Sequence, residues 1–164
     1  MKYLLIVSLL SFGFVSGTGT QIEQGKVTQL KLDLKENQTI ISAGSDGSFD
    51  WLFGKGYKQL TLTEKDIDNA ENLIKACFEN QKMGAVNKFY RKKPEDYYKQ
   101  FVGAINYKGE KTIWVNCFCR KAKDDFENWK TELVVVKDGG NCFFNITINA
   151  DNNEYYDLNV NGNG

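Results

Sequence analysis

The stretch TEKDIDNAENLIKACFENQKM (residues 63–83) carries the clearest helix pattern of the chain. Thr63 suits the cap of the first turn, and Asp66 follows it at the spacing of a capping box. Leu62 before the cap and Ile67 after it form a hydrophobic staple. The sequence therefore predicts an amphipathic helix from Thr63 to about Met83, followed by Gly84 as its C-terminal stop. Its apolar face holds residues at helical spacing, among them Ala70, Leu73, Ile74, Cys77 and Phe78.

The sequence after this helix predicts strands, because apolar and polar side chains alternate along it. A turn at Lys108–Glu110 separates the first two strands. A second turn at Asp138–Asn141 predicts a short hairpin, which requires positive φ at its glycines, Gly139 and Gly140. The predicted strands are Tyr97–Tyr107, Thr112–Arg120, Leu133–Val136, Cys142–Ala150 and Tyr156–Val160.

A helix followed by consecutive strands predicts an α+β fold, with one long helix packed on a curved antiparallel sheet of four to five strands. Leu30, Leu32 and Leu34 alternate with charged residues, so we expect an extra N-terminal strand or hairpin segment there, which Thr39–Ser42 could pair. The core should join one face of the helix to one face of the sheet. Its expected members are Leu73, Ile74, Cys77 and Phe78 with Ile113, Val115, Phe144, Ile146 and Leu158.

The first residues have the pattern of an export signal. Lys2 precedes an apolar run, and Val15-Ser16-Gly17 supplies a cleavage site of small residues. We expect residues 1–17 to be a signal peptide, residues 18–61 a strand and loop segment, and residues 62–164 the helix-plus-sheet domain. The run is too short for a stable membrane span, and no cysteine lies near the cleavage site. The expected location is therefore periplasmic or secreted, without a lipid anchor.

Export places the four cysteines, Cys77, Cys117, Cys119 and Cys142, in an oxidising compartment, where disulfides form. Residues two apart on a strand lie about 6.5–7 Å apart, so Cys117 and Cys119 should not bridge each other. We expect Cys142 to bridge Cys117 or Cys119, and Cys77 to bridge the remaining one. Four buried free thiols are the alternative.

The composition excludes several function classes. The 164 residues contain 21 Lys and Arg, 21 Asp and Glu, and no histidine. Without histidine there is no Ser-His-Asp or Cys-His catalysis and no His-containing zinc site. Without a basic excess, nucleic acid is not an expected partner. No cofactor motif is present, and we expect no cofactor and no enzymatic activity.

The glycine-rich loop Ser42–Gly56 and the residue that follows it carry four aromatic side chains, Phe49, Trp51, Phe53 and Tyr57. They can cover an edge of the core or bind a ligand, which would be a protein, a peptide or a glycan. Asp46 and Asp50 flank this aromatic loop, and paired carboxylates are the basis of glycoside hydrolysis. A carboxylate-based hydrolase is therefore the third choice of function, after a binding or interaction module and a protease inhibitor.

The C-terminal part of the chain carries an aromatic strand with Gly103, the turn segments Asn106–Glu110 and Asp138–Phe144, and the segments Trp114–Cys119 and Val160–Gly162. This series resembles small exported Bacteroidetes-type proteins of unassigned function, and the resemblance covers about the last 100 residues. It implies a cystatin-like arrangement of helix on curved sheet. The function that we expect, a small exported binding or interaction module that engages its ligand through the sheet or the loop of residues 43–57, follows from the residues and not from this resemblance.

Gln100–Tyr107 (QFVGAINY) is similar to the Gln-x-Val-x-Gly hairpin with which cystatins block proteases. The glycine comes one position early, and the Pro-Trp pair of the second cystatin hairpin is missing. This similarity implies a cystatin-type protease inhibitor as the alternative to the binding module.

Overall fold

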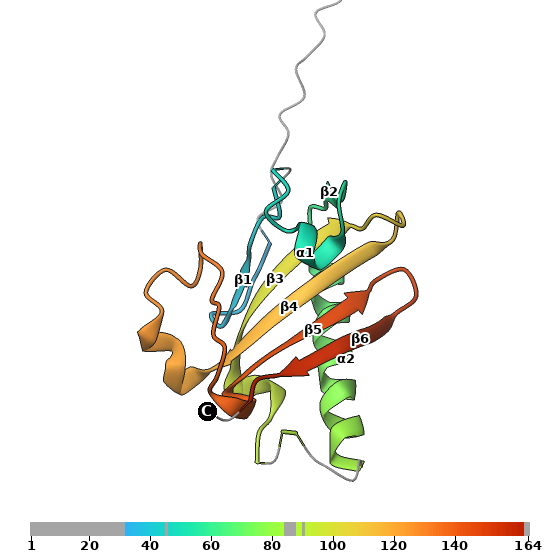
Figure 1. The fold of residues 1–164 in the computed structure, drawn as a ribbon. Helices are drawn as coiled ribbons and strands as arrows, with labels where there is room; N and C mark the ends of the chain where they lie inside the picture. Colours follow the sequence, from blue (N-terminus) through green and yellow to red (C-terminus); the bar gives the residue numbers. More distant parts are fainter. Residues whose placement is uncertain (1–31, 45, 84–87, 90, 163–164) are drawn as a thin grey trace, which may run out of the picture. The chain divides into compact units, whose positions relative to one another are not determined.

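The computed structural model describes residues 32–44, 46–83, 88–89 and 91–162 (Figure 1). The expected signal peptide, Leu30 and Gly84 lie outside the described residues. Among the described residues, no helix has the length and apolar character needed to cross a bilayer.

The protein is α+β, and its sheet is mixed, with six strands. The strand order is β1-β3-β4-β5-β6, and β2 also pairs with β3. The β3-β4-β5-β6 part is antiparallel, as expected, whereas β1 runs parallel to β3. The prediction of a purely antiparallel sheet of four to five strands is therefore wrong at the edge, where Gln38–Ile40 pairs with β3 in the same direction. The strands are β1 (Gln38–Ile40), β2 (Lys58–Gln59), β3 (Tyr97–Ile105), β4 (Lys111–Cys119), β5 (Phe143–Asn149) and β6 (Glu154–Val160).

Helix α2 (Glu64–Met83) begins as the capping pattern predicts. The Asp66 carboxylate accepts hydrogen bonds from the Thr63 amide at 2.8 Å and from the Thr63 hydroxyl at 2.7 Å, and the Asp66 amide donates back to Thr63 Oγ1 at 3.3 Å. The helix lies across one face of the sheet (Figure 1). The predicted core is confirmed, with Leu73 and Leu158 at its half-buried margin. Its members include Ile74, Cys77 and Phe78 from α2 and Ile113, Val115, Phe144 and Ile146 from the sheet.

The opposite face of the sheet is also covered, which the sequence did not predict. Around Val102, Ala104 and Trp114, the short helix α1 (Asp50–Phe53) and the loop beside it close a second apolar cluster. A third cluster joins Phe118 to Trp129 and Val134. The segment 126–139, here called the strap, supplies the last two residues.

The strap replaces a predicted strand. Leu133–Val136 forms no strand. Its backbone is hydrogen-bonded by side-chain amides of the sheet and not by the backbone of a neighbouring strand. Gln100 donates to the carbonyls of Trp129 at 2.6 Å and Glu132 at 2.7 Å, and its Oε1 accepts from the Val134 amide at 2.9 Å. Asn116 donates to the Val134 carbonyl at 2.7 Å.

Gly139 and Gly140 have the positive φ values predicted for them, 99° and 58°. The predicted hairpin does not form, because no strand directly precedes these glycines. They lie at the start of the turn η3 (Gly140–Cys142), which leads into β5. The extra N-terminal strand exists as β1, which overlaps the predicted Thr39–Ser42 and pairs with β3. The strand predicted around Leu32 and Leu34 is wrong, because both side chains pack against the α2 side of the core but form no ladder.

One ion pair lies inside the α2 side of the core. Lys99 Nζ is 3.1 Å from Glu71 Oε1, and both side chains are almost fully enclosed. Gln38 donates to the same carboxylate oxygen at 2.6 Å. This group therefore joins α2, β3 and β1.

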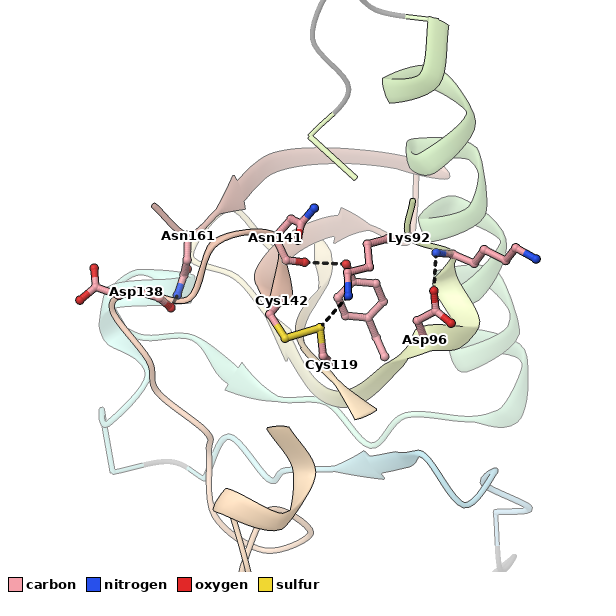
Figure 2. The surroundings of a disulfide bond; sticks show 9 residues. Lys92, Asp96, Cys119, Asp138, Asn141, Cys142 and Asn161 are labelled. Carbon is pink, nitrogen blue, oxygen red and sulfur yellow. Dashed lines mark hydrogen bonds between the residues drawn. A yellow bond between two sulfur atoms is a disulfide. The ribbon is translucent and has the colours of Figure 1, made fainter. Parts of the chain in front are cut away.

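The disulfide of the chain joins Cys119 at the end of β4 to Cys142 in η3, which is one of the two pairings expected for Cys142. Figure 2 shows Lys92 beside it, donating to Cys119 Sγ at 3.3 Å. Nearby, the Tyr97 hydroxyl donates to the Asn141 carbonyl at 2.6 Å. Cys77 and Cys117 are buried free thiols, so the second expected bridge does not form.

Alkylation with iodoacetamide tests this cysteine assignment. Without reductant, we expect two labels after unfolding, on Cys77 and Cys117, and four after reduction. In the native protein both should react slowly, because burial raises the pKa of Cys77 to about 11 and also raises that of Cys117. Intact-mass measurement counts the labels. Four labels in the unfolded, unreduced protein would show that the disulfide is absent, and none would show a second bridge.

Candidate ligand-binding site

The loop between β3 and β4 is held by a single side chain. Asn106 Oδ1 accepts hydrogen bonds from the amides of Lys108 at 2.9 Å and Glu110 at 3.1 Å, and Asn106 Nδ2 donates to Glu110 Oε2 at 3.0 Å. Gly109 supplies the positive φ of 86° that the turn needs. The position of Tyr107 in this loop is therefore fixed by the backbone on both sides.

Tyr107 is 66% exposed, yet its ring lies against another part of the chain. A Cβ added to Gly54 would lie 2.5 Å from Cδ1 of the ring, so the ring rests directly on the Gly54 backbone. The Tyr107 amide also donates to the Phe53 carbonyl at 3.2 Å. Only glycine at position 54 allows this approach, and its φ of 81° suits glycine as well.

Tyr107 and Tyr156 line a cavity of about 420 Å³ on the face of the sheet that carries α1. Tyr156 stands on β6 opposite Thr147 and is 39% exposed. The remaining walls come from α1, the β3–β4 loop and the ends of β4, β5 and β6. We call this space the tyrosine cavity; its other lining residues are Leu52, Phe53, Asn106, Lys108, Glu110, Thr112, Asn149 and Asp157.

Asn149 gives the cavity a polar group of defined orientation. Its Oδ1 accepts the amides of Asp151 and Asn152, each at 3.1 Å, which fixes the side-chain amide. The residue is only 7% exposed, and its Nδ2 has no hydrogen-bond partner among the described residues. In the described part of the chain, every side-chain nitrogen or oxygen that is fully buried has a hydrogen-bond partner. Because Asn149 Nδ2 has none, it is not fully buried and is accessible to a ligand.

The charges around the cavity are mixed. Burial raises the pKa of Tyr156 above its ordinary value, and a hydrogen bond with Thr112 opposes this rise. The carboxylates of Asp157 and Glu110 raise the same pKa further, and the Lys108 ammonium lowers it. The phenol is therefore neutral at physiological pH and can donate a hydrogen bond.

The four aromatic residues proposed from the sequence have different roles. Phe53 and Tyr57 are buried with their ring centroids 5.6 Å apart, and the Tyr57 hydroxyl donates to the Ala43 carbonyl at 2.8 Å. They anchor the loop, and Phe49 is half-buried beside them. Trp51 is 65% exposed and packs edge-on against Trp114 at 5.6 Å, one residue before the cavity-lining Leu52.

The other two sequence-based candidates lie outside the cavity. Hydrogen bonds from the Ser48 side chain and from the Ser48 amide, which lies 3.0 Å from Asp46 Oδ1, keep the pKa of Asp46 below its ordinary value. Asp50 begins α1. Of the cystatin-like stretch Gln100–Tyr107, all but the last two residues lie in β3, where Gln100 is 0% exposed and Gly103 faces the Leu62 side chain. Gln100 is therefore enclosed between the sheet and the strap.

A larger cavity of about 590 Å³ lies between the exposed side of α2 and the β5–β6 turn. None of the residues that line it is aromatic, so it offers no fixed ring for stacking. No group of three or more cysteine, aspartate or glutamate side chains in the described part of the chain is arranged to hold a metal ion.

Sequence reasoning missed Tyr107, Tyr156 and Asn149. The turn at Lys108–Glu110 places Tyr107 beside a hairpin tip, which is a local signal of exposure. Tyr156 and Asn149 lie in strands. They line the same cavity only because of the register in which β4, β5 and β6 pair.

Comparisons of the chain with protein-family models, curated proteins and solved structures found no match.

Proposed function

We propose that this protein is an exported, non-catalytic binding module that holds its ligand in the tyrosine cavity. The observation that carries the proposal is the placement of its exposed rings. The large apolar side chains exposed in the described part of the chain are Trp51, Tyr107, Val135 and Tyr156. Tyr107 and Tyr156 line the tyrosine cavity, and Trp51 is next in sequence to its lining residue Leu52.

This arrangement has the properties of a preformed binding site. A volume of about 420 Å³ is within the usual range of ligand sites, about 300–1,000 Å³. Tyrosine rings contribute contact area at a low entropy cost, and here Gly54 and Asn106 already fix the ring and its loop. A ligand therefore loses little binding free energy to the ordering of this ring and loop.

Two further observations support the remaining parts of the proposal. The Cys119–Cys142 disulfide is consistent with export, and thus with the signal peptide proposed for residues 1–17. Packing of α2 across β3–β6 is consistent with the proposed cystatin-like arrangement. A relationship to small exported Bacteroidetes-type proteins is proposed on the sequence resemblance alone.

Arrays of immobilised glycans and peptides test this function. We expect the protein to bind a subset of one array, and replacement of Tyr107 and Tyr156 by alanine to abolish that binding. Val135→Ala is the matched control, because Val135 is an exposed apolar residue on the strap, outside the cavity. Binding that survives loss of both tyrosines, or that Val135→Ala removes, would place the ligand elsewhere and refute the proposal.

A further inference from the structure

We infer that the ligand of the tyrosine cavity is an uncharged saccharide, an inference that rests on the binding function proposed above. Three features of the cavity lead to this ligand class: the fixed ring of Tyr107, the amide donor of Asn149, and the carboxylates of Glu110 and Asp157.

The Tyr107 ring offers a stacking surface. One side rests on Gly54, and the ring is otherwise largely exposed. The apolar C–H face of a pyranose packs well on such a ring, since aromatic faces attract weakly positive hydrogens. Lys108 Nζ lies over this ring, 5.7 Å from its centroid, so the exposed lysine side chain has to move aside when a sugar stacks there.

Asn149 discriminates between sugars and cationic side chains. Its Nδ2 is a donor, oriented by the two bonds of its own Oδ1, and it needs an acceptor from the ligand. A lysine or arginine side chain carries only donors and cannot satisfy it. A sugar hydroxyl or an acetamido oxygen accepts this bond, and a hydroxyl can at the same time donate to a carboxylate.

The carboxylates restrict the ligand further. Glu110 uses Oε2 to accept from Asn106, and no hydrogen bond to its other oxygen is seen within the described residues. With Asp157 it presents acceptors that suit hydroxyl donors and repel the carboxylates of acidic sugars. A neutral saccharide can stack on the ring, accept from the amide donor and donate to the carboxylates at the same time.

Titration calorimetry of the full exported chain with defined probes tests this inference. The probes are maltotriose, cellotriose, chitotriose, trigalacturonic acid and trilysine. We expect at least one neutral trisaccharide to bind. Asn149→Asp should weaken its binding about tenfold, because the aspartate still accepts the amides of residues 151 and 152 but loses the donor. Thermal unfolding of the variant checks that the turn persists.

A pair of glycine variants provides the second test. Gly54→Ala and Gly56→Ala place a side chain at nearly the same φ, 81° and 80°, but only the first meets the Tyr107 ring. Both should lose stability because of the positive φ, Gly54→Ala more because its side chain also meets the ring, and only Gly54→Ala should lose affinity for the neutral trisaccharide. Equal affinity of the two variants would overturn the role of the fixed ring.

The remaining outcomes separate this inference from the proposed function. If a neutral trisaccharide binds and Asn149→Asp leaves its affinity unchanged, the inference fails. If only trigalacturonic acid or trilysine binds, and Tyr107→Ala abolishes this binding, the ligand is not an uncharged saccharide but the tyrosine cavity is still the binding site. If none of the probes and no array member binds, both proposals fail.

Discussion

Replacement of Phe144 by alanine is expected to lower the free energy of unfolding by about 3–5 kcal/mol. Its ring lies between the two layers, with centroids 4.8 Å from Phe89, 4.9 Å from Tyr97 and 5.8 Å from Phe78. Its removal leaves a cavity that these rings can fill only partly. Ile74→Ala, on the facing side of α2, should have an effect of about 2–5 kcal/mol for the same reason.

Urea unfolding followed by circular dichroism measures both variants. Val135→Ala is the control and should stay within about 0.5 kcal/mol of the wild type, because Val135 is exposed on the strap. If Phe144→Ala also remained within that margin, α2 and the sheet could not be packed as described.

Removal of Lys99 alone is the second change with a large expected effect. Lys99→Met leaves the Glu71 carboxylate buried without its cation, which should lower the free energy of unfolding by about 3–5 kcal/mol. The amide of Gln38 still donates to Glu71 but carries no charge to balance it.

The double variant Lys99→Met/Glu71→Gln separates charge from packing. Glutamine retains an acceptor for Gln38 and removes the buried charge, so the double variant should be more stable than Lys99→Met by about 2 kcal/mol. Urea unfolding at neutral pH measures the difference. A double variant no more stable than Lys99→Met would mean that the pair acts through side-chain volume and not through charge.

The sequence predicts well those features whose signals are local. The cap at Thr63 and Asp66 depends on residues three apart, and the alternation in β4 and β5 shows which side chains face the helix. The positive φ of Gly139 follows in the same way from the short turn.

Features that depend on tertiary contacts are not predictable in this way. Leu133–Val136 has the composition of a strand, but Gln100 and Asn116, distant in sequence, bind its backbone with their side chains. Parallel pairing of β1 with β3 likewise involves residues about 60 apart. The strand propensity of the strap is overridden by these contacts.

The candidate site shows the same division. The loop aromatics were visible in the sequence, but which of them are buried depends on the sheet face beneath them. Tyr107 and Tyr156 are 49 positions apart by number and meet only because β4, β5 and β6 are neighbours.

NMR mapping of the ligand contacts shows whether the tyrosine cavity binds an uncharged saccharide. Amide shifts of the ¹⁵N-labelled protein would be followed during titration with the neutral trisaccharides. We expect the shift changes to concentrate on residues 53–54, 106–112, 149–152 and 156–157. Shifts concentrated on the strap or on the exposed side of α2, or no shifts with any of them, would contradict it.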